Sequence, residues 1–104
     1  MNHTFSQTGG ARLGYFNASY PLAALSGDAN GLRIVCLGED YFFPKTKIKK
    51  LSRHQRMFSV GLRIEHTEPK YPPLVVFWAS VFFWTSGFRS LTAHLKQLGY
   101  GIHQ

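Results

Sequence analysis

The sequence predicts a mainly β domain: a curved antiparallel sheet or barrel of six or seven strands, with one C-terminal α-helix packed over an opening. Three observations predict this fold class. Nine Phe, five Tyr and two Trp occur in 104 residues, and aromatic side chains pack well on a pleated sheet. Short apolar runs, several of them alternating, are separated by turn residues. The end of the chain instead carries an apolar stripe with helical spacing.

The length of the chain suits one domain, and a 44% hydrophobic composition is too apolar for a disordered protein. Residues 1–17 are polar and contain three glycines, which predicts a flexible N-terminal arm. Residues 18–104 are therefore expected to form the single folded domain.

The first strands are predicted from two apolar runs on either side of a turn. Residues 20–26 (YPLAALS) and 32–37 (LRIVCL) flank GDANG, whose Gly, Asp and Asn favour a tight turn, so these runs are expected to form a β-hairpin. Residues 41–43 (YFF) follow a second turn, GED. This third strand is expected to stop at Pro44, because proline cannot donate a hydrogen bond to a sheet ladder.

The stretch KTKIKKLSRHQR, residues 45–56, does not alternate regularly. Ile48 and Leu51 are three residues apart, so both cannot point inward on a regular strand. A bulge, or one turn before a strand that starts near Ile48, would resolve this conflict.

The last two predicted strands differ in pattern. Residues 61–66 (GLRIEH) alternate cleanly, which places His66 on the apolar face as a partly buried histidine with a hydrogen-bond partner. Residues 74–80 (LVVFWAS) are apolar on both faces for five residues, which predicts the most buried strand.

A helix is predicted over about residues 87–98, because apolar residues recur there at spacings of three, four and three. The stripe consists of Phe88, Leu91, Leu95 and Leu98. Thr85 or Ser86 can cap the first turn through a side-chain oxygen, and Gly99 can close the last turn in a left-handed conformation.

Strands followed by one C-terminal helix resemble the pleckstrin-homology-like (PH-like) fold, and the sequence is most similar to small bacterial proteins with that fold. The resemblance covers roughly residues 18–100 and is carried by GLRIVCLGEDYFFPKTKIKKL, GLRIEHTEPKYPPLVVFW and FRSLTAHLKQLGY. It implies a non-enzymatic platform that binds phosphoinositide headgroups, peptides or other proteins. The usual lipid site of the family needs Lys and Arg around the first hairpin loop. Here that loop carries Asp28, with Arg33 as the nearby cation, which argues against that site.

The net charge of +7 favours phosphate-rich partners through long-range attraction. Six cations in the basic stretch are candidates for anion binding: Lys45, Lys47, Lys49, Lys50, Arg53 and Arg56. One interpretation is an edge strand whose lysines prevent unwanted strand pairing. Another is a surface for acidic lipid or nucleic acid, with affinity that falls steeply with salt. A third is a surface for a protein partner. No aromatic residue interrupts the stretch, whereas interleaved aromatics would favour single-stranded nucleic acid through base stacking.

An apolar run follows the most buried strand and includes Phe82, Phe83 and Trp84. One small domain has little room to bury all of these side chains, and contiguous exposed apolar surface usually marks an interface. We therefore expect self-association or membrane contact through this segment, which would make the chain a homo-oligomeric assembly module.

No catalytic, metal or cofactor site is expected. Four of the five acids fall in predicted turns, and Glu65 and His66 are strand neighbours that point to opposite faces. Cys36 has no nearby His or Cys at metal-ligand spacing, and no phosphate-binding loop or nucleophile motif occurs. The chain is therefore predicted not to be an enzyme and to have no small-molecule substrate.

The predicted function is a non-catalytic PH-like interaction module that binds a protein, itself or an anionic partner. The N-terminus has no apolar leader region. The charge-free stretch at residues 71–88 holds an unbroken apolar run of about eleven residues, whereas a membrane-spanning helix needs about twenty. A cytoplasmic location, or a peripheral one at a membrane, is expected.

Overall fold

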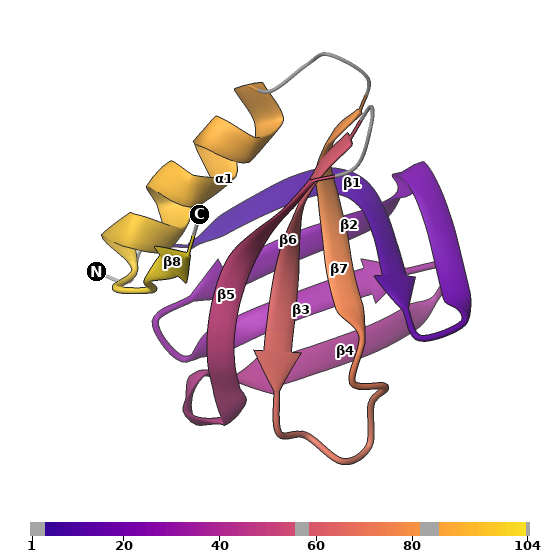
Figure 1. Cartoon of the computed structure of the whole chain (residues 1–104), viewed down its shortest axis with the longest axis horizontal. Helices are drawn as coiled ribbons and strands as arrows, with labels where there is room; N and C mark the ends of the chain where they lie inside the picture. Colours follow the sequence, from indigo (N-terminus) through magenta and orange to yellow (C-terminus); the bar gives the residue numbers. More distant parts are fainter. Residues whose placement is uncertain (1–3, 56–58, 82–85, 104) are drawn as a thin grey trace.

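The computed structural model describes residues 4–55, 59–81 and 86–103. Within these residues, eight strands form one sheet in the order β4-β3-β2-β1-β7-β6-β5-β8. The sheet curls into a half-barrel, and helix α1 lies across one opening (Figure 1). The strands are β1 Phe5–Leu13, β2 Phe16–Asp28, β3 Gly31–Cys36, β4 Glu39–Pro44, β5 Ile48–Gln55, β6 Ser59–His66, β7 Val75–Val81 and β8 Ile102–His103. The predicted mainly β architecture with one C-terminal helix is confirmed, but the described residues form eight strands rather than six or seven.

The prediction of a flexible arm over residues 1–17 was wrong for residues 5–13, which form β1 between β2 and β7. The glycines of this segment serve close packing rather than flexibility. A Cβ on Gly9 would collide with the Trp78 carbonyl oxygen and lie 2.7 Å from the Phe77 ring. A Cβ on Gly10 would lie 2.8 Å from the Ala18 carbonyl oxygen. Only glycine lets the neighbouring chains approach β1 so closely.

The predicted hairpin of β2 and β3 is present, with a shorter turn than expected. The strands extend to Asp28 and Gly31, which leaves two residues in the turn, and the Asp28 carboxylate accepts a 2.8 Å hydrogen bond from the Asn30 N–H. Edge strand β4 ends at Pro44, as expected. The Phe42 N–H donates to the Tyr71 hydroxyl at 3.3 Å, so the loop after β6 protects part of this edge.

The irregular basic stretch contains both of the features that the sequence suggested. A 3-10 turn, η1 (Lys45–Lys47), precedes β5, and the pairing of β5 with β6 shifts register between Ile48 and Lys50. Leu51 is thereby buried in the core. In the centre of the sheet, the first three residues of β7 are all buried, as the apolar run predicted: Val75, Val76 and Phe77.

Helix α1 (Ser86–Gln97) closes the core, and all four residues of the predicted stripe are buried: Phe88, Leu91, Leu95 and Leu98. Two residues after the helix, Gly99 has a φ of +88°, and the Tyr100 N–H donates to the Leu95 carbonyl oxygen at 2.9 Å. This left-handed ending returns the chain to the sheet, where β8 pairs with β5. Among the described residues, no helix has both the length and the apolar character needed to cross a bilayer.

Candidate anion-binding site

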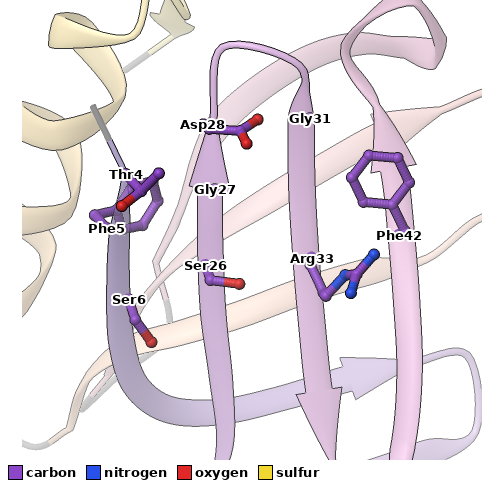
Figure 2. A pocket seen from close by; sticks show the side chains of 9 residues that line it. All are labelled: Thr4, Phe5, Ser6, Ser26, Gly27, Asp28, Gly31, Arg33 and Phe42. Carbon is purple, nitrogen blue, oxygen red and sulfur yellow. The ribbon is translucent and has the colours of Figure 1, made fainter. Parts of the chain in front are cut away.

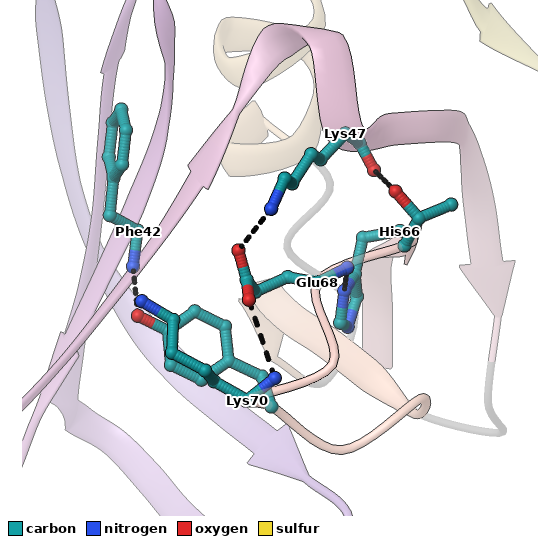
Figure 3. Close-up of polar contacts among 7 residues, drawn as sticks. Phe42, Lys47, His66, Glu68 and Lys70 are labelled. Carbon is teal, nitrogen blue, oxygen red and sulfur yellow. Dashed lines mark hydrogen bonds and ion pairs between the residues drawn. The ribbon is translucent and has the colours of Figure 1, made fainter.

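Lys47, the last residue of η1, contacts a polar cluster in the loop after β6 (Figure 3). Its ammonium group donates to the Glu68 carboxylate at 3.0 Å, and Glu68 is only 7% exposed. The hydrogen bond from Lys47 holds the pKa of Glu68 below its usual value, and the Lys70 N–H contributes in the same direction against the effect of burial. The Lys47 side chain is 44% exposed, but its charge is already paired with a carboxylate, which weakens its attraction for an external anion.

The same cluster determines the tautomer of His66. Its Nδ1 accepts a hydrogen bond from the Glu68 N–H at 3.0 Å, so the proton of the neutral ring lies on Nε2 and is donated to the Pro72 carbonyl oxygen at 2.8 Å. The prediction of a partly buried histidine with a hydrogen-bond partner is confirmed.

Two other cations of the basic stretch lie against aromatic rings. The Lys45 ammonium nitrogen is 4.8 Å from the centroid of the Tyr100 ring. The Arg53 guanidinium carbon is 5.9 Å from that of Phe88. Cation–π contacts of this kind stabilise the fold modestly at exposed sites and leave the charges open to solvent. Arg56 lies outside the described residues.

The remaining lysines come together at a small cavity of about 170 Å³ beside the end of α1. Lys49 and Lys50 are exposed, and neither forms an ion pair within the part of the chain that the structure describes. The register shift in β5 inserts Lys49 as an additional residue of the strand. No acidic residue lines the cavity, which is formed by Lys45, Ile48, Lys49, Lys50, Leu51, Gly99, Tyr100 and Gly101. The structure thus brings three of the six predicted cations together.

A larger groove of about 610 Å³ crosses the outer face of β1 to β4 (Figure 2). Its centre is a row of directly paired residues, Ser6, Ser26, Arg33 and Phe42. Arg33 lies 3.4 Å from the Asp40 carboxylate and stacks over the Phe42 ring at 5.1 Å. Because Asp28 also lines the groove, this site is less suited to an anion than the lysine cavity.

The predicted interface residues Phe82, Phe83 and Trp84 lie outside the described residues, so that hypothesis stays a prediction. Other large apolar side chains are exposed on β2, on β3 and in their flanking turns: Tyr15, Phe16, Tyr20, Leu22, Val35 and Leu37. We did not predict them, although the sequence carried a signal. In LRIVCL, Val35 and Leu37 are apolar although they share a face with Arg33, whereas a sheet with one solvated face usually alternates apolar and polar residues.

Cys36 is buried in the core, and burial, with a smaller contribution from Glu39, raises the pKa of its thiol. Within the described ranges, no group of three His, Cys, Asp or Glu side chains could hold a metal ion. Comparison of the sequence with protein-family models and with curated proteins gives no match.

Proposed function

We propose that this chain is a non-catalytic PH-like interaction module whose lysine cavity binds an anionic group of its partner. What supports the PH-like assignment is a curled, almost entirely antiparallel sheet followed by a single helix that covers one opening of the half-barrel (Figure 1). What supports the absence of catalysis is that the candidate acid–base residues have structural partners. The Glu68 carboxylate accepts hydrogen bonds from Lys47 and the Lys70 N–H, and both ring nitrogens of His66 are bonded to backbone groups.

One observation carries the anion proposal: Lys45, Lys49 and Lys50 line a single cavity, and none of the described residues that line it is acidic. Like charges repel by about 1 kcal/mol at 4 Å even in water, so a bound anion relieves repulsion as well as gaining attraction. A volume of 170 Å³ corresponds to several water molecules at about 30 Å³ each, which is enough for a phosphate group.

The test is titration with inorganic phosphate and with vesicles that contain phosphatidylserine. Lys49→Gln combined with Lys50→Gln should weaken binding at least about tenfold, which corresponds to about 1.4 kcal/mol. The matched control is Lys70→Gln combined with Arg89→Gln, because it removes two exposed charges elsewhere. Equal affinities of the two double variants would contradict the proposal.

A second candidate function, binding of a protein partner, is favoured by the exposed apolar residues around the β3–β4 turn. Leu22 is 51% exposed, and Leu37 is 56% exposed with a left-handed φ of +50°. An apolar side chain in such a turn gains little from folding alone. Pull-down from a native lysate should lose specific bands in Leu22→Ser and in Leu37→Asn. Identical bands in wild type and variants would rule out this surface.

A further inference from the structure

An open aromatic platform lies on the outer face of β7, the face opposite the core. Trp78 is directly paired with Gly10 of β1 on one side and with Gly61 of β6 on the other. Its indole leans over Gly61, where a Cβ would lie only 2.8 Å from the Trp78 ring. The ring of His54, from β5, follows beyond Gly61 at 5.4 Å between centroids and 59° between planes. Because both residues directly paired with Trp78 are glycines, no side chain lies beside the indole at those two positions, and Trp78 is partly exposed.

A second aromatic residue borders this platform. In the pairing of β1 with β2, Gly9 is opposite Ala23 but Ala11 is opposite Ala18, so residues 19–22 bulge outward beside Gly10. A Cβ on Gly10 would lie 3.1 Å from the Tyr20 nitrogen. Tyr20 is 56% exposed. The backbone of Tyr20 thus lies beside Gly10, the strand neighbour of Trp78, and the Tyr20 side chain is exposed.

A row of cations runs alongside the aromatic row. Arg12 of β1 and Arg63 of β6 are each directly opposite Val76 of β7. Val76 lies on the same face of β7 as Trp78 and is only 1% exposed. The Arg63 Nε is buried and has no hydrogen-bond partner among the residues that the structure describes, whereas the Arg12 Nε donates to the Gly14 carbonyl oxygen at 3.2 Å. Two residues of strand, about 7 Å, separate this row from Trp78.

The cationic row continues toward the lysine cavity. Ser52 of β5 is opposite Arg63, and Lys50 lies two residues further along the same face of β5. Lys50 also lines the cavity. The acid on this part of the face is Glu65, which is opposite Lys50 and weakens the attraction for anions there. The strongest phosphate contacts on the face are therefore expected at Arg12 and Arg63.

We propose that this outer face binds single-stranded nucleic acid, with bases stacked on Trp78 and Tyr20 and phosphates held by Arg12 and Arg63. Stacking on aromatic side chains next to cations is how proteins bind single strands without reading their sequence, and it requires bases that are not paired. This proposal names the partner that the proposed function leaves open. Only the additional binding by the lysine cavity rests on the proposed function.

The fluorescence of Trp78 provides a direct test. The chain has two tryptophans, so Trp84→Phe leaves Trp78 as the sole indole. Oligo(U) and oligo(dT) of about twelve nucleotides, a length within the range that single-strand binding surfaces cover, should quench its emission. A duplex of the same length should quench it less. Affinity should fall between about 50 and about 150 mM salt, with a log–log slope near −0.7 for each neutralised phosphate. Absence of quenching, or equal affinity for the duplex, would overturn the inference.

Variants test the individual contacts through anisotropy of a labelled oligonucleotide. Arg12→Gln combined with Arg63→Gln should weaken binding at least about tenfold relative to the control Lys70→Gln combined with Arg89→Gln, which has the same net charge. Tyr20→Ser changes an exposed side chain, so the fold should be retained, and binding should weaken roughly fivefold to a hundredfold. Unchanged affinity in both variants would refute the assignment of this face.

The inference and the proposed function can fail separately. If phosphate binds and needs Lys49 and Lys50, but no oligonucleotide quenches Trp78, the lysine cavity stands and the nucleic-acid inference is wrong. If oligonucleotide binding needs Arg12 and Arg63 while the Lys49→Gln, Lys50→Gln variant binds both probes normally, the nucleic-acid inference stands and the lysine cavity is not the anion site.

Discussion

The packing of α1 against the sheet predicts a large cost for Leu95→Ala. Leu95 is fully buried at the centre of the apolar stripe, and α1 packs on β6, β7 and β8. Its carbonyl oxygen accepts hydrogen bonds from the Leu98 and Tyr100 N–H groups, and alanine retains both because they involve only the backbone. The substitution therefore isolates the side chain, and truncation of a core leucine costs about 2–5 kcal/mol. Since domains of this size are stable by about 5–15 kcal/mol, a substantial share of the free energy of unfolding should be lost.

The measurement is urea unfolding followed by far-ultraviolet circular dichroism, with the midpoint compared at constant slope. Lys96→Ala is the matched control, because Lys96 is the next residue of the helix and is exposed. The control should change the free energy of unfolding by no more than about 0.5 kcal/mol. A loss for Leu95→Ala as small as that of the control would refute the conclusion that the stripe faces the core.

Two further predictions concern pH. Because the pKa of Glu68 is lowered in the fold, its carboxylate stabilises the protein above about pH 4.5, and this contribution is lost as the pH falls further. In urea unfolding between about pH 3 and 7, the free energy of unfolding should therefore fall more steeply with acid in wild type than in Glu68→Gln. Equal pH dependence would contradict the Lys47–Glu68 interaction. Burial, with a smaller effect of Asp28, raises the pKa of Tyr100 to about 12. The neutral phenol therefore stabilises the fold fully below about pH 10, and this stabilisation is lost as the pH rises toward 12. When tyrosinate absorbance is followed as the pH is raised, the tyrosine that ionises at the highest pH in wild type should be missing in Tyr100→Phe. An unchanged titration curve would count against the burial of Tyr100.

The sequence predicted those elements whose pattern is local. The spacing of the α1 stripe reports which face is buried, and the Ile48–Leu51 conflict revealed the irregular start of β5. Strand β1 was missed because its burial depends on distant partners. The glycines of FSQTGGARL resemble a flexible segment until Phe77 and Trp78 are known to pack against them.

The candidate sites were less predictable for the same reason. The basic stretch identified Lys45, Lys49 and Lys50, but only the structure shows that Lys47 is held by Glu68 and that the C-terminal turn completes the cavity. The aromatic platform is formed by strands that are far apart along the chain, so no local pattern could reveal it.

The pairing of β1 with β7 also has a consequence for how the chain is made. Gly10 to Leu13 pair with Val75 to Trp78, and this ladder joins the β1–β4 meander to β5–β7. During synthesis on the ribosome, the first meander can form as soon as it emerges, whereas its β1 edge stays unpaired until most of the chain has been translated. An unpaired strand edge can pair with the edge of another chain. The sequence of β1 contains Ser, Thr and two adjacent glycines and few large apolar residues, so this strand is poorly suited to aggregation. The composition of β1 would therefore protect the nascent chain before it serves the finished fold.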